Sequence, residues 1–279
     1  MKRLAVLGHP VAHSRSPAMQ SAALAALGLG EEWSYEAIEM PPEDFPELTR
    51  ALPAEGFVGA NVTIPHKEAA LALAGHASAA ATEIGAANTL SFADGEISAE
   101  NTDAPGLLAT LSEPPSGKRA LVLGAGGSAR AAAWVLAGQG ATTEIWNRTP
   151  ERAHELARAL SETSAGASGP LTAVSADRVA AADYDLIVNC TAVGMEGAGD
   201  PFADLPLDAE RIGPGLVLVD LVYGGEDTEL IATGRDRGAD VVGGLEVLVA
   251  QGAESLRIWT GREIGPETIE AMRRAASGA

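Results

Sequence analysis

Residues 120–129 of this 279-residue chain read Ala-Leu-Val-Leu-Gly-Ala-Gly-Gly-Ser-Ala, an apolar run that passes directly into a glycine-rich turn. The apolar residues Ala120–Leu123 are continuous rather than alternating, which predicts a strand buried on both faces. An alanine-rich stretch follows and predicts a long helix, and Thr143–Trp146 predicts the next strand. This order indicates an α/β domain with a parallel sheet.

The spacing of Gly124, Gly126 and Ala129 gives the pattern G-x-G-x-x-A between the predicted strand and helix. Glycine at the first position permits a tight turn, glycine at the second lets a pyrophosphate approach the backbone, and a small third residue lets helix and strand pack closely. The helix N-terminus adds unpaired N–H groups for the anion. The alternative is a glycine turn with a purely structural role. We predict a dinucleotide site formed by Gly124, Ala125, Gly126, Gly127, Ser128 and Ala129.

The end of the second strand indicates which dinucleotide binds. A site for NAD usually has an acidic residue there for the ribose hydroxyls. This chain instead has Asn147-Arg148-Thr149. A guanidinium suits a 2′-phosphate, so we expect NADP, with Asn147 and Thr149 adding neutral hydrogen bonds. The alternative is a surface arginine at the start of a helix.

Further strands are predicted at Leu171–Val174, Leu186–Val188, Leu216–Leu221 and Asp240–Val242. Ligands lie beyond the carboxyl ends of parallel strands, so the segment Asn189–Met195 is expected to face the cofactor. Cys190, the only cysteine, is interpreted as a packed small residue rather than a nucleophile, since no base is near it in sequence. Residues 161–170 are small and polar and are expected to form a surface loop.

The first hundred residues also alternate between strand and helix patterns. Asp94-Gly95 between two short strand-like runs predicts a hairpin. Ser16 is expected to cap the first helix, with Pro17 at its first position. The predicted strands are Leu4–Leu7, Tyr35–Glu39, Phe57–Thr63, Leu90–Ala93 and Glu96–Ala99, and the predicted helices are Ser16–Leu27, Glu43–Leu52, Pro65–Ala74, Ala104–Leu111, Leu245–Trp259 and Pro266–Ala275.

The composition argues against several classes of function. The net charge of −19 argues against nucleic-acid binding, which needs a basic face. No apolar run approaches the ~20 residues needed to span a bilayer, and the apolar N-terminal run is too short for a signal peptide. We therefore expect a cytoplasmic protein without a membrane partner. One cysteine and scattered histidines predict neither an internal disulfide nor a metal site.

Lys67 is a candidate catalytic residue because the chain has only two other lysines and uses arginine for most positive charges. A lysine can exchange a proton at moderate cost, whereas arginine cannot. Asp103 lies where it could cap a helix, and Ser14 and Ser16 could bind a carboxylate near a helix N-terminus. The alternatives are a solvated lysine at Lys67 and plain helix caps at Asp103 and Ser16.

Together these segments resemble the shikimate dehydrogenase family over almost the whole chain. The resemblance is carried by segments that occur in this order: Gly8-His9-Pro10, His13–Pro17, Asn61–Lys67, Gly85–Thr89, Asn101–Asp103, the glycine turn, Asn147–Thr149, Asp220–Tyr223 and Gln251. Some positions differ from the family's pattern. Ala192 stands where a proline is usual, Val247 replaces a methionine expected near the nicotinamide, and Ala18–Ser21 and Gly224-Gly225 also depart from it.

The resemblance implies roles for individual residues. Lys67 and Asp103 match the catalytic pair. The substrate contacts it implies are Ser14 and Ser16 for the carboxylate, Thr63, Asn88 and Gln251 for the ring hydroxyls, and Tyr223. Besides the glycine turn and Asn147–Thr149, cofactor contacts are expected at Thr191, Gly194, Met195, Leu221 and Gly244.

The implied activity is the reversible, NADPH-dependent reduction of 3-dehydroshikimate to shikimate, in the biosynthesis of chorismate and aromatic amino acids. The implied fold is an N-terminal α/β substrate domain with a mainly parallel sheet (1–103 and 243–279) plus a Rossmann-type doubly wound NADP-binding domain (104–242), with the substrate in the cleft between them. The chain is expected to be a monomer or homodimer. The alternatives are a quinate or aminoshikimate dehydrogenase of the same fold, or a non-catalytic NADP-binding regulator.

Overall fold

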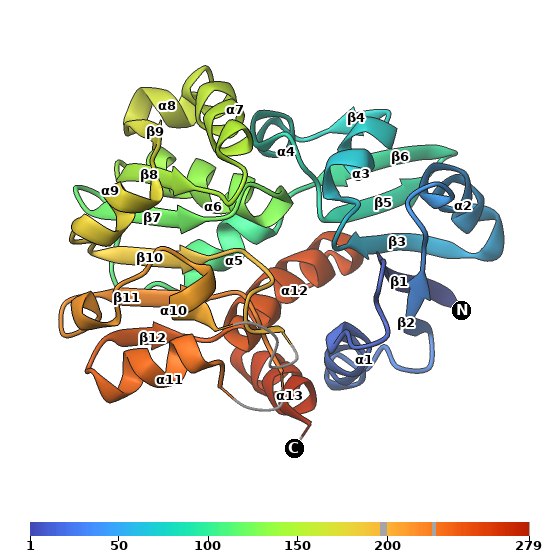
Figure 1. Ribbon diagram of the computed structural model, residues 1–279. Coiled ribbons are helices and arrows are strands. Elements are labelled where there is room, and N and C mark those ends of the chain that lie inside the picture. The colour runs from blue at the N-terminus through green and yellow to red at the C-terminus, as the bar shows by residue number, and fades with distance from the viewer. Residues whose placement is uncertain (196–199, 225–226, 279) are drawn as a thin grey trace. The chain divides into compact units, whose positions relative to one another are not determined.

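The computed structural model describes residues 1–195, 200–224 and 227–278 (Figure 1). The chain divides into two compact units: unit 1 comprises Met1–Gly106 and Leu248–Ala279, and unit 2 comprises Leu107–Val247. Within the described residues, no helix is long and apolar enough to cross a membrane.

Unit 1 is built on a mixed six-stranded sheet in the order β2-β1-β3-β5-β6-β4. The strand β1 lies between β2 and β3 and is parallel to both, whereas β5 is antiparallel to β3 and β6. Its elements, in chain order, are β1 Lys2–Gly8, α1 Ser16–Ala26, β2 Trp33–Glu39, α2 Phe45–Ala51, η1 Leu52–Glu55, β3 Phe57–Val62, α3 Lys67–Leu73, β4 His76–Ala77, α4 Ala79–Ile84, β5 Thr89–Ala93, β6 Glu96–Glu100, α5 Asp103–Thr110, α12 Gly244–Thr260 and α13 Pro266–Ser277, of which α5 and α12 continue into unit 2.

The hairpin predicted at Asp94-Gly95 is confirmed, since β5 and β6 pair across these two residues. Both have positive φ, +54° and +79°. This is the backbone that a tight two-residue hairpin requires, and Asp-Gly tolerates it.

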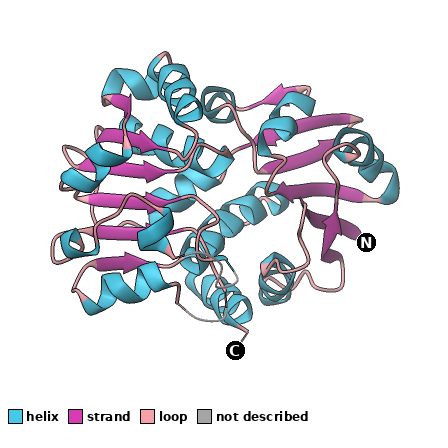
Figure 2. Ribbon diagram, in the orientation of Figure 1, coloured by secondary structure: helices cyan, strands magenta, loops and turns pink. Residues whose placement is uncertain are grey.

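Unit 2 is built on an all-parallel six-stranded sheet in the order β12-β11-β10-β7-β8-β9, with helices on both faces (Figure 2). Read from β9, this is the doubly wound order expected of a Rossmann fold. Its elements are β7 Arg119–Leu123, α6 Gly127–Gly138, β8 Thr142–Trp146, α7 Pro150–Ser161, α8 Ser164–Ser168, β9 Leu171–Ala173, α9 Ala176–Ala181, β10 Leu186–Asn189, α10 Pro201–Asp204, η3 Ala209–Arg211, β11 Val217–Asp220, α11 Glu229–Asp236 and β12 Asp240–Val242.

Each unit has its own hydrophobic core. In unit 1 the core includes Leu7 and Phe45, and in unit 2 it includes Leu121 and Leu218. The central strand β7 is buried from Ala120 to Leu123, as its unbroken apolar run predicts.

Three local expectations from the sequence are wrong. Residues 161–170 contain the short helix α8, because Thr163 caps it and the fully buried Ala165 packs against α6. Ser16 is not a helix cap, since Arg15 holds the cap position and the Ser14 hydroxyl accepts the Ser16 N–H. Asp103 is the first residue of α5, and the Asn101 side chain accepts the Ala104 N–H instead.

Candidate active site

Lys67 and Asp103 form a shielded ion pair in unit 1. The distance between Lys67 Nζ and Asp103 Oδ2 is 2.5 Å, and the side chains are 11% and 16% exposed. Because little water screens the pair, the attraction between its charges is strong. Lys67 is thus not a solvated surface lysine, and Asp103 does more than begin a helix.

His66 anchors the backbone next to Lys67. Its buried ring stacks on Phe45 with centroids 4.3 Å apart, and its Nε2 lies 2.7 Å from the Met40 carbonyl oxygen. Burial lowers the pKa of His66 below its ordinary value, so the ring is neutral at pH 7. With the proton assigned to Nε2 from this contact, His66 donates to Met40 and fixes the start of α3.

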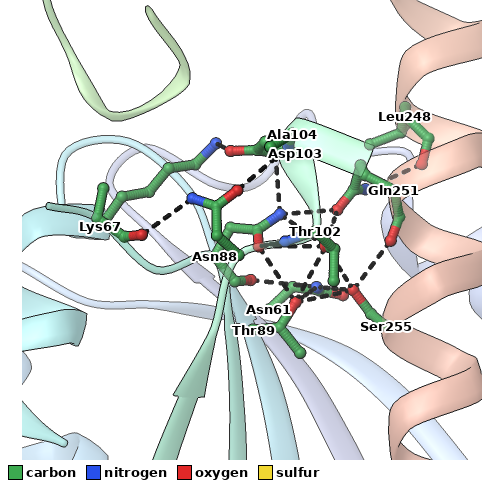
Figure 3. A network of polar contacts seen from close by, with 12 residues as sticks. Asn61, Lys67, Asn88, Thr89, Thr102, Asp103, Ala104, Leu248, Gln251 and Ser255 are labelled. Carbon is green, nitrogen blue, oxygen red and sulfur yellow. Dashed lines mark hydrogen bonds and ion pairs between the residues drawn. The ribbon is translucent and has the colours of Figure 1, made fainter. Parts of the chain in front are cut away.

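Asn88 holds the second oxygen of the Asp103 carboxylate (Figure 3). Its Nδ2 donates to Asp103 Oδ1 over 2.8 Å, and its Oδ1 accepts the main-chain N–H of Thr102 over 2.7 Å. The Thr102 N–H can only donate, so it determines which end of the carboxamide faces Asp103. One carboxylate oxygen therefore faces Lys67 and the other faces Asn88.

Gln251 extends this chain of contacts from α12. Its Oε1 lies 3.1 Å from Asn88 Nδ2, and its Nε2 donates to the Leu248 carbonyl oxygen over 2.9 Å. Four residues that are far apart in the sequence are thus connected in unit 1: Lys67, Asn88, Asp103 and Gln251.

Three of the other predicted substrate residues lie elsewhere in unit 1. Ser14 and Ser16 lie at the start of α1, where Ser16 is nearly buried. Thr63 follows β3, and its main-chain N–H donates to Leu7. Among the described residues, no hydrogen bond joins these three to the ion pair. Tyr223 belongs to unit 2, where it follows β11.

The predicted dinucleotide turn has the backbone that its sequence requires. Gly124 has a φ of +111°, which favours glycine, and a Cβ there would lie 3.2 Å from the Cys190 carbonyl oxygen. Gly126 holds the N-cap position of α6, and a Cβ on it would meet no atom within 4 Å. Ala129 is fully buried. Gly127 and Ser128 form the first turn of α6, so its N-terminal N–H groups adjoin open space that suits an anion.

The segment after β8 leaves a guanidinium at the surface. Asn147 Nδ2 donates to the Thr149 carbonyl oxygen over 2.9 Å, which shapes the turn. Arg148 is exposed, and no ion pair engages it in the described part of the chain. Thr149 caps α7 by position without a side-chain hydrogen bond. The three residues fit a phosphate-binding segment.

A buried carboxylate connects the loops that follow β10 and β11. Asp220 is fully buried and accepts hydrogen bonds from Asn189 Nδ2 (2.9 Å), Thr228 Oγ1 (2.6 Å) and the Val222 N–H (3.1 Å). Burial raises the pKa of Asp220, and these hydrogen bonds oppose that shift. Thr191 in turn donates to Asn189 Oδ1.

The remaining predicted cofactor residues lie in or beside these loops. Gly194 has a φ of +92°, and Met195 ends the described part of its loop. Leu221 directly follows β11. Gly244 begins α12, where a Cβ would lie 2.6 Å from the Val222 carbonyl oxygen. Among the described residues, no group of three or more His, Cys, Asp or Glu side chains is arranged to hold a metal.

Known proteins of one family match this chain along its whole length. Residues 6–90 match the family model for the shikimate dehydrogenase substrate binding domain, residues 108–194 that for shikimate / quinate 5-dehydrogenase, and residues 244–276 that for the shikimate 5′-dehydrogenase C-terminal domain. An NADP(+) shikimate dehydrogenase of Thermus thermophilus is 43% identical over 280 residues, which cover 100% of both chains. The chain belongs to the shikimate dehydrogenase family.

A further relative and a solved structure match this chain over nearly its whole length. The NADP(+) shikimate dehydrogenase of Moorella thermoacetica is 41% identical, covering 99% of this chain and 94% of the relative. The crystal structure of shikimate 5-dehydrogenase from Thermus thermophilus in complex with NADP(H) and shikimate has a TM-score of 0.84 at 42% identity, covering 99% of this chain and 100% of that one.

In this member of the shikimate dehydrogenase family, four buried polar residues next to Asn88 are not predicted as site residues from the sequence. Asn61, Thr89, Thr102 and Ser255 are all buried there. Two of these four residues have a signal in the sequence: Asn61 interrupts the apolar strand Phe57–Val62, and Ser255 lies one helical turn after Gln251. A polar residue in a predicted core position needs a partner, which points to a buried network.

Proposed function

We propose that this chain catalyses the reversible reduction of 3-dehydroshikimate to shikimate with NADPH, a step in the biosynthesis of chorismate and the aromatic amino acids. The full-length similarity to NADP(+) shikimate dehydrogenases supports this activity. The structural observation that carries the proposal is the shielded Lys67–Asp103 pair, whose carboxylate is held by Asn88.

The residues of unit 1 supply the proton chemistry. The Lys67 ammonium polarises the ring carbonyl and donates the proton to its oxygen, and the Lys67 amine accepts that proton in the reverse direction. Asp103 keeps the ammonium in place through Oδ2 and accepts a hydrogen bond from the neighbouring ring hydroxyl. NADPH, when bound, supplies the hydride, and NADP⁺ accepts it in the reverse direction.

The substrate is oriented by polar side chains that are not involved in the proton transfer. Ser14 and Ser16 bind its carboxylate, helped by the N-terminal end of the α1 dipole. Thr63, Asn88 and Gln251 hold the ring hydroxyls, and Tyr223 makes a further contact. Residues 1–103 and 243–279 form the substrate domain in this proposal.

The cofactor is bound by residues 104–242. The pyrophosphate lies on the Gly124–Ala129 turn, where the open space beside Gly126 supports this assignment. The exposed Arg148 binds the 2′-phosphate, with Asn147 and Thr149 beside it. Further contacts come from Thr191, Gly194, Met195, Leu221 and Gly244.

A substrate panel tests the proposal. Purified protein is assayed for nicotinamide reduction with shikimate, quinate and aminoshikimate, each with NADP⁺ and with NAD⁺. We expect the highest kcat/KM for shikimate with NADP⁺. A higher value for quinate or aminoshikimate would assign the chain to another dehydrogenase of this fold. Binding of NADP⁺ without turnover of any substrate would indicate a non-catalytic regulator.

A further inference from the structure

Three buried hydroxyls meet behind Asn88, and we call Thr89, Thr102 and Ser255 the hydroxyl cluster (Figure 3). Their oxygens are 2.9 Å apart for Thr89 and Ser255, 3.0 Å for Thr102 and Ser255, and 3.2 Å for Thr89 and Thr102. All three side chains are buried from solvent. Buried hydroxyls stabilise a structure only when partners satisfy them, so this cluster strongly constrains the elements that carry it.

Ser255 joins the helix α12 to the sheet of unit 1. Its hydroxyl donates to the main-chain carbonyl oxygen of Gln251 over 3.0 Å and accepts from Asn61 Nδ2 over 2.9 Å. Asn61 lies in β3, and its Oδ1 accepts the Tyr35 hydroxyl over 2.8 Å. The helical turn that carries Gln251 is therefore hydrogen-bonded to a side chain of the sheet, which is itself fixed.

The turn that carries Gln251 is held on other sides as well. A Cβ on Gly106 of α5 would lie 2.7 Å from Gln251 Cβ, which shows how closely the two helices approach. The carbonyl oxygen of Gly252 accepts a hydrogen bond from Gln20 Nε2 over 2.9 Å. Gln251 therefore reaches Asn88 from a helix whose position is set by contacts that do not touch the ion pair.

We propose that Ser255 is a positioning residue, which acts through Gln251. Through the hydroxyl cluster it fixes α12 where Gln251 Oε1 meets Asn88 Nδ2, and this contact supports the Asn88–Asp103–Lys67 chain. The inference rests on the proposed function, because the group that Ser255 serves is the one assigned to substrate binding and proton transfer.

The first test compares two hydroxyl deletions on α12. We expect Ser255→Ala to lower kcat/KM for shikimate about tenfold, while KM for NADP⁺ changes less than about twofold. Thr260→Ala is the matched control, since Thr260 makes the same bond to the carbonyl four residues earlier (Leu256, 2.7 Å) outside the cluster. Equal kcat/KM values for the wild type and Ser255→Ala would overturn the proposal.

A double-mutant cycle with Gln251→Ala separates positioning from a general structural role. If Ser255 acts through Gln251, the Ser255→Ala change should lower kcat/KM less than about twofold in the Gln251→Ala background. The same tenfold loss in both backgrounds would overturn the proposal. Absence of wild-type shikimate oxidation would instead contradict the proposed function.

Two further measurements apply if Ser255→Ala folds poorly or if shikimate is not the substrate. Thr89→Val removes a cluster hydroxyl at constant shape, whereas Thr89→Ser keeps it, so only Thr89→Val should lower kcat/KM. A crystal structure of Thr89→Val should show the contact between Gln251 Oε1 and Asn88 Nδ2, now 3.1 Å, lengthened beyond hydrogen-bonding distance. An unchanged contact would overturn the proposal.

Discussion

Lys67 differs from the other two lysines in its surroundings. Lys118 pairs with the exposed Glu113, and Lys2 lies over the Trp33 ring, whereas Lys67 faces a shielded carboxylate. Because Lys67 carries the proton in the proposed reaction, Lys67→Ala should lower kcat by about 10²–10⁴-fold. The measurements are steady-state kinetics and an NADPH fluorescence titration, which should show unchanged cofactor affinity. Lys118→Ala is the control, and near-normal turnover by Lys67→Ala would refute the assigned role.

Arg148 governs the choice of cofactor in the proposed site. Loss of its charge-assisted bonds to the 2′-phosphate should cost about 1.5–3 kcal/mol, which corresponds to a rise of about 10–150-fold in KM for NADP⁺ in Arg148→Ala. The KM for NAD⁺ should hardly change, since NAD⁺ lacks that phosphate. Arg158→Ala, at an exposed position in the last turn of α7, should leave both values unchanged. Equal losses with the two cofactors would contradict a 2′-phosphate site at Arg148.

His66 gives the fold an acid-sensitive contact. Burial holds its pKa below the value in the unfolded chain, so between these values the unfolded state binds more protons. The stability contributed by neutral His66 is therefore present above the unfolded pKa of about 6.5 and declines as the pH falls toward the folded value. We expect the melting temperature to fall between about pH 7 and pH 5, with a smaller slope in His66→Phe. The exposed His76→Gln variant should keep the wild-type slope, and identical slopes in all three proteins would contradict this role.

The sequence predicts which residues belong to the candidate site better than it predicts which residues cap the helices. Lys67, Asn88, Asp103 and Gln251 can be named from motifs and the family resemblance, and they are connected in the structure. Ser16 and Asp103 are predicted to cap helices, yet each lies one residue inside its helix. Neighbouring polar residues compete for the same free N–H groups, so sequence alone does not decide which of them becomes the cap.

At the scale of elements, apolar strand runs and long amphipathic helices are predicted correctly, whereas short helices are not. The strand β7 follows the continuous apolar run Ala120–Leu123, and the helix α12 follows a periodic pattern over 17 residues. The short helices α4 and α8 do not, because each is stabilised by a cap and by tertiary contacts that a sequence window does not contain. Residues 161–170 have the small polar composition of a loop, and the sequence does not indicate that Ala165 is buried.

The close approach of α5 and α12 depends on Gly106. A Cβ there would overlap the backbone of Gln251, with its nitrogen 2.8 Å away. We expect Gly106→Ala to lower the free energy of unfolding by about 1–3 kcal/mol, because helix backbones cannot yield as a flexible side chain can. Thermal or urea unfolding measures the change. Gly213→Ala, where the nearest atom to a Cβ is 3.7 Å away, is the control, and equal stability of the two variants would contradict the packing argument.

At the scale of the whole molecule, charge is the dominant property. Asp and Glu outnumber Lys and Arg by 38 to 19, so the folded chain carries strong self-repulsion. Salt screens this repulsion, and we expect the melting temperature to rise as NaCl increases from about 10 to 200 mM. Differential scanning calorimetry provides the measurement, with a matched series in buffer of constant pH. A melting temperature that falls over this range would show that specific ion pairs outweigh the net charge.

The turn-rich residues Ser112–Gly117, followed by a second strand–helix series, indicate a boundary in the chain. The tertiary contacts around Asn88 have no such signal. Asn61 and Ser255 are separated by 194 positions in the chain, and their 2.9 Å contact depends on how β3 and α12 pack. No periodicity or motif spacing encodes such a distance. Only the folded arrangement of unit 1 brings these two residues together.

Unit 1 is assembled from both ends of the chain, residues 1–106 and 248–279. A ribosome therefore produces Asn61, Asn88 and Thr102 early, then all of unit 2, and only afterwards Gln251 and Ser255. Until those last residues emerge, the early polar side chains lack their partners from α12. A prematurely terminated polypeptide ending before Leu248 would contain every strand of the parallel sheet and the Lys67–Asp103 pair, but it would lack Gln251, which contacts Asn88. Translation order thus makes unit 1, which contains the Lys67–Asp103 pair, the last unit to be completed.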